Sequence, residues 1–234
     1  MERNRPPVRH ELKYVMNYGE YMHLSRTMDY CLQRDPGGDQ YNEYAIRSLY
    51  FDTAFDDFLN EKLMGVENRQ KYRLRIYRYS DKDIKLECKA KYGDLISKRS
   101  LLIPRDLADQ LIACDPSGLE KTSAPLLHDM YREMRTRLLH PVVIVDYIRE
   151  AYIYEPEDVR ITFDKEIRTG MNNLDMFDPH IPTLPVMDEN VVVLEVKFQR
   201  VLPDFIKNLL TGISAQRMAV SKYVLCRRFE EKDF

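Results

Sequence analysis

The sequence predicts an α+β fold, in which a mostly antiparallel sheet of about eight strands closes into a wide barrel with helices packed outside it. Three segments, residues 69–79, 83–91 and 191–199, carry charged residues at alternate positions with apolar residues between them. Because a strand sends alternate side chains to opposite faces, each segment has one charged face and one apolar face. A barrel accommodates both, since the apolar face lies outward under helices and the charged face lines a wet interior.

The composition restricts the class of protein. At 234 residues, with 44% hydrophobic and 32% charged residues, the chain is globular, and we expect a single domain over residues 1–234. The formal net charge of −2 argues against a protein that coats nucleic acid, because such proteins are usually basic overall. Any basic site must therefore be local and balanced by acidic residues elsewhere.

Targeting signals and cysteine motifs are missing from the sequence. The N-terminal residues form no apolar signal sequence and no apolar run is long enough to span a membrane, so we expect a cytoplasmic protein. The four cysteines are far apart and form no CxxC pair, which argues against zinc and redox motifs. We expect free, buried thiols, since a chain of this size needs no disulfides.

Breakers and short polar turns divide the first half of the chain into strands and helices. The run Pro36-Gly37-Gly38 ends the first helix, and turns at 80–83 and 92–94 join three consecutive strands into a meander. The predicted elements are a strand over 8–18, a helix over 20–32, a strand over 43–52, a short helix over 54–62, and strands over 69–79, 83–91 and 95–103.

Helical periodicity alternates with strand patterns in the second half. Pro104 occupies the favoured first position of a helix, and Leu126, Met130 and Met134 repeat at helical spacing. The predicted elements are helices over 104–113 and 124–138, strands over 141–154 and 159–167, a loop over 170–188, a strand over 191–199, a helix over 203–210 and a basic C-terminal segment.

The charged faces of the meander suit a polyanion. Arg73 and Arg75 lie two positions apart, so their guanidinium groups project side by side and can contact successive phosphates in a bidentate manner. Lys85, Glu87 and Lys89 repeat this geometry on the neighbouring strand. The alternative interpretations are a solvated edge of a β-ribbon for the arginines and cross-strand ion pairs for the lysines.

Glu195 and Lys197 share one face of a strand that is otherwise strongly apolar, so both need partners. A divalent cation for the Glu and a phosphate for the Lys would serve, and an internal salt bridge is the alternative. Arg149 and Arg160 lie on a predicted hairpin from which both can reach the same face. No Gly-rich phosphate loop occurs in the sequence, so phosphate would have to be bound by side chains.

A series of short motifs, in this order, resembles the VTC (vacuolar transporter chaperone) domain, the polyphosphate polymerase branch of the triphosphate tunnel metalloenzymes in the CYTH-like superfamily. The resemblance runs from about residue 8 to residue 228. The motifs are Glu11-Leu12-Lys13-Tyr14, Ser48-Leu49-Tyr50-Phe51-Asp52, Tyr72-Arg73-Leu74-Arg75, Lys85-Leu86-Glu87-Cys88-Lys89, Tyr147-Ile148-Arg149-Glu150-Ala151-Tyr152, Leu194-Glu195-Val196-Lys197-Phe198 and Ser221-Lys222-Tyr223.

The resemblance implies an eight-stranded antiparallel tunnel that binds a nucleoside triphosphate or polyphosphate. Family members of the polymerase type move the terminal phosphoryl group of ATP onto a polyphosphate chain with the help of a divalent metal. Two alternatives remain open at this point. One is hydrolysis of tripolyphosphate or a nucleoside triphosphate in the same tunnel, and the other is a module that binds polyphosphate without turnover.

The resemblance also implies roles for individual residues. Glu195 and Glu11 would hold Mn²⁺ or Mg²⁺. The residues implied to bind phosphate and support catalysis are Lys13, Arg73, Arg75, Lys89, Arg149, Arg160, Lys197 and Lys222. Further substrate contacts are implied for Lys85, Lys98 and Ser221.

The sequence departs from the family pattern in two ways. Tunnel hydrolases and cyclases usually open with an ExExK strand, but this chain has Arg9-His10-Glu11-Leu12-Lys13, with Arg9 at the first acidic position. The first strand therefore offers fewer carboxylate ligands to a metal, which favours the polymerase branch. Eukaryotic relatives also carry a phosphate-sensing SPX domain and membrane helices that this sequence lacks, so we expect that any translocation needs a separate membrane partner.

Overall fold

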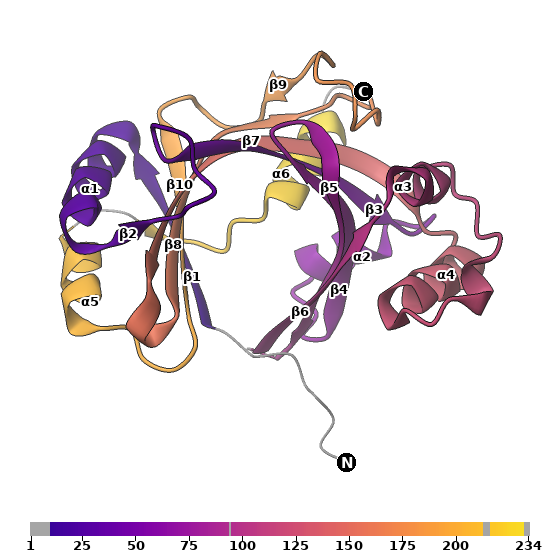
Figure 1. Cartoon of the computed structure of the whole chain (residues 1–234), viewed down its shortest axis with the longest axis horizontal. Coiled ribbons are helices and arrows are strands. Elements are labelled where there is room, and N and C mark those ends of the chain that lie inside the picture. The colour runs from indigo at the N-terminus through magenta and orange to yellow at the C-terminus, as the bar shows by residue number, and fades with distance from the viewer. Residues whose placement is uncertain (1–9, 94, 213–215, 232–234) are drawn as a thin grey trace.

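The computed structural model describes residues 10–93, 95–212 and 216–231, and its centre is one strongly curved antiparallel sheet (Figure 1). The strands of the sheet are β1 (His10–Asn17), β2 (Gln33–Arg34), β3 (Glu43–Asp52), β4 (Arg69–Tyr77), β5 (Ser80–Tyr92), β6 (Leu95–Ile103), β7 (His140–Tyr154), β8 (Val159–Thr169), β9 (Leu184–Pro185), β10 (Val191–Phe198) and β11 (Gln216–Arg217). The helices are α1 (Tyr18–Cys31), α2 (Asp57–Leu63), α3 (Arg105–Ile112), α4 (Pro125–Arg137), α5 (Asp204–Thr211) and α6 (Lys222–Glu231), with 3₁₀ turns at Leu119–Lys121 and Glu155–Glu157.

The predicted α+β fold is confirmed, with one difference in how the sheet ends. Its strand order is β11-β1-β10-β8-β7-β3-β4-β5-β6, with β2 added beside β7 and β9 beside β8. Within the described residues β11 and β6 are the edges and no ladder joins them, so the sheet curves around an interior without closing.

A short segment near the C-terminus occupies part of the edge of β1, on the side where the barrel stays open. The free edge of β1 pairs with β11, where Tyr14 lies opposite Arg217, and the Met218 amide donates to the Lys13 carbonyl at 3.1 Å. The backbone groups that a closing strand would use are therefore already satisfied here. Side chains span the gap instead, because Lys89 on β5 forms an ion pair with Glu11 on β1 at 2.6 Å.

Helices cover the outer face of the sheet on two sides (Figure 1). On one side α1 and α5 bury Leu24, Met28 and Ile206 against β8 and β10. On the other side α3 and α4 bury Leu111 and Met130 against β4, β5 and β6. The outward residues of the strands are thus apolar, as the alternating pattern predicts.

The concave face is apolar at one end, which the sequence analysis missed. There α6 lies inside the curve of the sheet, with Tyr223 and Cys226 packed on Val145 and Val193 (Figure 1). We expected only a basic C-terminal segment. The signal was present, since buried positions Tyr223, Cys226 and Glu230 repeat at helical spacing.

The other predicted elements agree with the structure to within a few residues. The start of β5 differs by three residues, since the strand begins at Ser80 because Arg78 and Tyr79 have positive φ and form a tight turn, and α2 begins three residues later than predicted. The predicted start of the first strand, residues 8–9, lies outside the described residues. All four cysteines are free, but Cys31 and Cys114 are exposed, contrary to the expectation of buried thiols. The described helices include none with the length and apolar character needed to cross a membrane.

Candidate functional site

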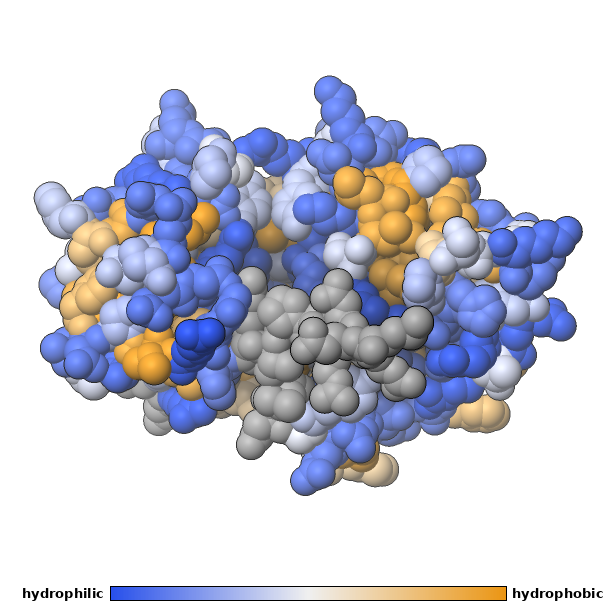
Figure 2. All heavy atoms as spheres, turned by 60° about the horizontal axis from the view of Figure 1, so that its bottom comes forward, coloured by the Kyte–Doolittle hydropathy of each residue, from blue (hydrophilic) through white to orange (hydrophobic). Residues whose placement is uncertain are grey.

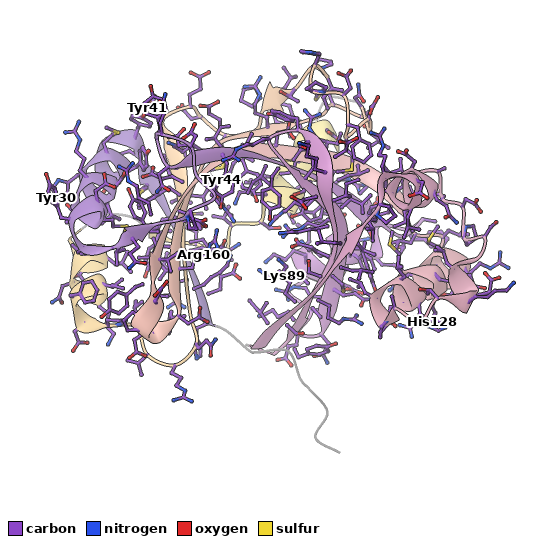
Figure 3. The ribbon with its side chains drawn as sticks, viewed as in Figure 1. Tyr30, Tyr41, Tyr44, Lys89, His128 and Arg160 are labelled. Carbon is purple, nitrogen blue, oxygen red and sulfur yellow. The ribbon has the colours of Figure 1, made fainter. Side chains whose placement is uncertain are left out.

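The concave face of the sheet encloses a cavity of about 590 Å³. Its walls come from α2, β1, β3, β4, β5, β6, β7 and β10, and residues 217–223 pass along one side. Hydrophilic side chains gather around the hollow in the middle of the face that Figure 2 presents, and Figure 3 shows Lys89 reaching from β5 into this interior. Alternation along the strands places one row of side chains from each strand here.

The lining is strongly basic. Among the described residues, twelve lining side chains are Lys or Arg and two are carboxylates. The basic residues are Lys13, Lys62, Arg69, Lys71, Arg73, Arg75, Lys89, Lys91, Arg149, Lys197, Arg217 and Lys222, and the carboxylates are Glu11 and Glu195. The formal net charge of the whole chain is only −2, so the positive charge is concentrated at this one place.

Glu195 lies at the centre of a cluster of cations. Its carboxylate is 2.9 Å from Lys197, 3.4 Å from Lys13 and 3.8 Å from Arg149. Burial alone would raise the pKa of Glu195, but Lys197 and Lys13 hold it well below its usual range. Glu195 is therefore a carboxylate at neutral pH and can accept a cation.

Glu11 is the second carboxylate of the cavity. It lies 3.1 Å from Lys13 and 2.6 Å from Lys89, on the strand paired with that of Glu195. Burial alone would lower the pKa of Lys13, but Glu195 and Glu11 hold it above its ordinary value. Lys13 also donates to the Val220 carbonyl at 3.1 Å, which ties the C-terminal segment to the site.

A buried acid on the inner face of β5 orients the arginines of β4. Arg73 donates to Glu87 at 2.7 Å and to the Tyr50 hydroxyl at 2.8 Å, and Arg75 donates to the Tyr147 hydroxyl at 3.1 Å. Burial would raise the pKa of Glu87, yet Arg73 and Arg75 hold it well below its usual range. The two guanidinium groups are thus fixed before any ligand arrives.

Asp164 plays the same role on the opposite wall. Arg149 donates to both of its oxygens, at 2.6 and 2.8 Å, and Lys222 forms an ion pair with it. The Lys222 ammonium also lies 4.8 Å from the centre of the Tyr147 ring. Sequence analysis gave Asp164 no role, although its position across β7 and β8 from Arg149 is the signal that could have identified it.

Most of the residues predicted for the site meet in this cavity. They are Glu11, Lys13, Arg73, Arg75, Lys89, Arg149, Glu195, Lys197, Ser221 and Lys222. The structure brings Ser221 there at the start of α6, where it accepts a hydrogen bond from Lys71 at 3.3 Å.

Three predicted residues lie outside the lining. Lys98 forms an ion pair with Glu87 from the neighbouring strand and is half exposed. Lys85 shares the inner face but lies farther along β5, with its ammonium 4.9 Å from the centre of the Tyr77 ring. Arg160 donates to Asp35 and Tyr44, and Figure 3 shows it on the opposite side of the interior from Lys89.

Several lining residues were not predicted. Lys71 and Lys91 continue the alternation of their strands, which predicts them on the charged face, although the sequence analysis gave neither a role in the site. Lys62 comes from α2 and Arg217 from β11, where no periodic pattern marks an inward position.

The donor set fits a divalent cation that takes most of its ligands from a substrate. Two carboxylates, Glu11 and Glu195, face the cavity, and no group of three or more His, Cys, Asp or Glu side chains in the described residues is arranged to hold a metal. Mg²⁺ commonly binds one or two carboxylates together with substrate phosphates and waters, and Mn²⁺ favours the same oxygen ligands. Both carboxylates are ion-paired with lysines, which a phosphate would draw away.

Comparison with known proteins identifies the family. The sequence matches the family model described as the VTC domain over residues 8–229, nearly the whole chain. The chain belongs to the VTC domain family. Among curated proteins, no sequence matches this VTC domain.

Solved structures share the fold of this VTC domain at low sequence identity. HpAC1 from Hippeastrum, a candidate adenylyl cyclase described as having a dominant triphosphatase activity, aligns with a TM-score of 0.59, 14% identity, and coverage of 95% of this chain and 96% of its own. The PH1819 protein from Pyrococcus horikoshii OT3 aligns with a TM-score of 0.54 and 14% identity, and the alignment covers 94% of this chain and 99% of its own. A candidate adenylate cyclase from Bacillus halodurans aligns with a TM-score of 0.52 and 12% identity, and the alignment covers 92% of this chain and 94% of its own. This likeness concerns the fold.

Proposed function

We propose that this VTC domain is a phosphotransferase that moves the terminal phosphoryl group of ATP onto polyphosphate inside the cavity. The lining of twelve cations and two carboxylates carries this proposal, because its excess of positive charge suits a ligand with many negative charges. Arginines held by buried acids are suited to phosphate, since their fixed forks can form bidentate hydrogen bonds to its oxygens.

The reaction asks little covalent chemistry of the protein. An oxygen of the terminal phosphate of the acceptor forms a bond to the γ-phosphorus of ATP, and the bond to the β–γ bridging oxygen breaks to leave ADP. Such transfers depend on positioning and on neutralising spread negative charge. Arg73, Arg75 and Arg149 supply fixed positive charge, and the acceptor is already ionised, so no protein base is required.

A divalent cation fits this reaction. Glu195, with Glu11, would hold Mn²⁺ or Mg²⁺, and such an ion would neutralise charge on the phosphate oxygens when bound. Lys13 lies between both carboxylates and would keep them oriented. Lys197 would turn from Glu195 toward the phosphates once the carboxylate has another cation.

Product analysis tests the proposal. Purified protein given ATP with Mn²⁺ or Mg²⁺ should form chains that a polyphosphatase degrades, together with ADP. The proposal would be contradicted if no such chains form with Mn²⁺ or with Mg²⁺, whether or not polyphosphate is added as an acceptor.

Hydrolysis is the second candidate function. The triphosphatase activity described for HpAC1, which shares the fold, favours it. In this case water replaces the acceptor phosphate, and orthophosphate would appear without chain growth. The third candidate function is binding of polyphosphate without turnover. Such a module would show tight, salt-sensitive binding of polyphosphate with no release of phosphate.

A further inference from the structure

The cavity divides into two sections that differ in their acidic residues. In one section every lining cation contacts a carboxylate: Glu11, Glu87, Asp164 and Glu195 lie within ion-pairing distance of these lysines and arginines. In the other, none of the lining cations forms an ion pair with any described carboxylate. We call this second group the acid-free section, and it consists of Lys62, Arg69, Lys71, Lys91 and Arg217.

The sheet register brings like charges together in and beside the acid-free section. Across β4 and β5, Arg69 lies opposite Lys91 and Lys71 lies opposite Lys89, whereas Arg73 lies opposite Glu87. Like charges directly opposite each other destabilise a sheet. The like-charge pairing is interrupted at Arg73 and Glu87 and returns where Arg75 lies opposite Lys85.

Lys71 illustrates the missing acid most clearly. Its ammonium donates to Ser221 at 3.3 Å and lies 4.4 Å from the centre of the Tyr223 ring. The charged groups that face it are Lys62 from α2, Lys13 from β1, Lys89 from β5 and Arg69 from its own strand. The acid at the far end of the Tyr223 ring, Asp52, accepts the Tyr223 hydroxyl. Burial and these cations lower the pKa of Lys71 well below its ordinary value.

We propose that the acid-free section binds the polyphosphate chain, whereas the section that contains the carboxylates binds the metal and the triphosphate. This inference rests on the proposed function and assigns its two substrates to different parts of one cavity. A polyphosphate chain bears negative charge along its whole length, so a wall of unpaired cations matches it and carboxylates would repel it. The triphosphate brings a divalent cation, for which Glu11 and Glu195 are suitable ligands.

A proton should accompany the chain into the acid-free section. An anion beside Lys71 stabilises its charged form, so the protein takes up a proton when the chain binds. Calorimetry in two buffers of different ionisation enthalpy measures this uptake. Uptake should be smaller in Lys71→Gln than in the wild-type protein, and equal uptake in both would overturn the role given to Lys71.

The test compares two ligands without turnover. In Lys62→Gln/Lys71→Gln/Lys91→Gln, affinity for polyphosphate should fall about tenfold or more, because charge-assisted hydrogen bonds are lost. Affinity for a non-hydrolysable ATP analogue with Mg²⁺ should change by less than about threefold, since its contacts lie in the other section. The control Lys82→Gln/Lys121→Gln/Lys207→Gln removes the same charge from exposed positions and should leave both affinities close to wild type.

Either of two results would overturn the inference. One is an equal loss of affinity for both ligands, and the other is no loss of polyphosphate affinity. The single variant Lys91→Gln, at a partly exposed strand end, repeats the comparison should the triple variant fold poorly. Because the assay measures binding alone, a protein that binds chains here but makes none would contradict only the proposed polymerase function. A protein that makes chains but fails this comparison would contradict only the division of the cavity.

Discussion

At the scale of single residues, Glu195 distinguishes a reaction site from a binding surface. It lies within 4 Å of three cations and stays ionised, so it can exchange a lysine for a metal ion. The alternative interpretation, a plain internal salt bridge, describes the ligand-free contacts equally well. The two differ in what the carboxylate does once phosphate and metal are added.

Glu195→Gln should separate binding from turnover. The amide keeps the shape but gives up the charge, so metal-dependent turnover should fall by about 100-fold. Affinity for tripolyphosphate without metal should stay the same or rise, because a negative charge leaves the cavity. Initial rates against Mn²⁺ concentration and calorimetric titration measure the two effects. Glu189→Gln, at an exposed position, serves as the control, and full metal-dependent activity in Glu195→Gln would contradict the metal role.

The sequence predicts inward positions better than it predicts where the cavity ends. Alternation places Arg73, Arg75 and Lys89 on the inner face, and all three line the cavity. Lys85 obeys the same alternation but lies too far along β5, because strand tilt and the position of α6 set the limits of the cavity. Arg160 is held by Asp35, which lies in a loop that no strand pattern can place.

At the scale of elements, α6 joins the hydrophobic core to the site. Its first residue is Lys222 and Ser221 precedes it, while Tyr223 is buried and donates to Asp52. The Asp52 carboxylate also accepts the amides of Phe58 at 2.9 Å and Leu59 at 3.0 Å, at the start of α2. One buried acid therefore fixes two helices that each contribute cations to the cavity.

Tyr223→Phe should lower the free energy of unfolding by about 1 kcal/mol, the usual loss for one hydrogen bond. Asp52→Ala should lower it by about 2–3 kcal/mol, since it leaves buried backbone donors without an acceptor. Urea unfolding of both variants tests whether Asp52→Ala loses more stability than Tyr223→Phe. Tyr30→Phe, at a side chain that is 93% exposed, should change nothing, and an Asp52→Ala protein as stable as wild type would refute the role of this acid.

The elements themselves follow from local patterns, but their closure does not. Periodicities of two and of 3.6 residues predict the eight longer strands and every α-helix of the described residues except α6, but not the two-residue strands β2, β9 and β11. The edge pairing of Gln216 and Arg217 with β1 involves two residues and leaves no such pattern, so an open sheet could not be distinguished from a closed barrel. The helix α6 was missed because its buried face is narrow.

At the scale of the whole molecule, charge is segregated: a nearly neutral chain encloses a strongly basic cavity. The cations repel one another, and burial together with these neighbours lowers the pKa of Lys62 and Lys71. Nearby, burial lowers the pKa of Lys98 to about 8, against the attraction of Glu87. A bound polyanion reverses this effect, so ligand binding and proton binding support each other.

The affinity for polyphosphate should therefore fall as the pH rises. Lysines with lowered pKa hold their protons less tightly in the free protein, and a bound anion raises that pKa again, so binding takes up protons and each rise in pH opposes it. Titrations from pH 6 to pH 9 at constant ionic strength, about 0.1 M to limit screening differences, measure the slope. An affinity that increases with pH would contradict this account of the cavity.

The most direct test of the central claim, that the cavity carries out phosphoryl transfer to polyphosphate, is ATP-dependent chain synthesis by Arg73→Gln/Arg75→Gln/Glu87→Gln. This variant removes both arginines together with the buried acid that holds them, so Glu87 is not left charged and unpaired. Lys82→Gln, which changes the net charge by the same amount at an exposed position, is the control, and thermal unfolding verifies that both proteins are folded. The account predicts polyphosphatase-sensitive chains from the wild type and the control and none from the cavity variant. Undiminished synthesis by a folded cavity variant would contradict it.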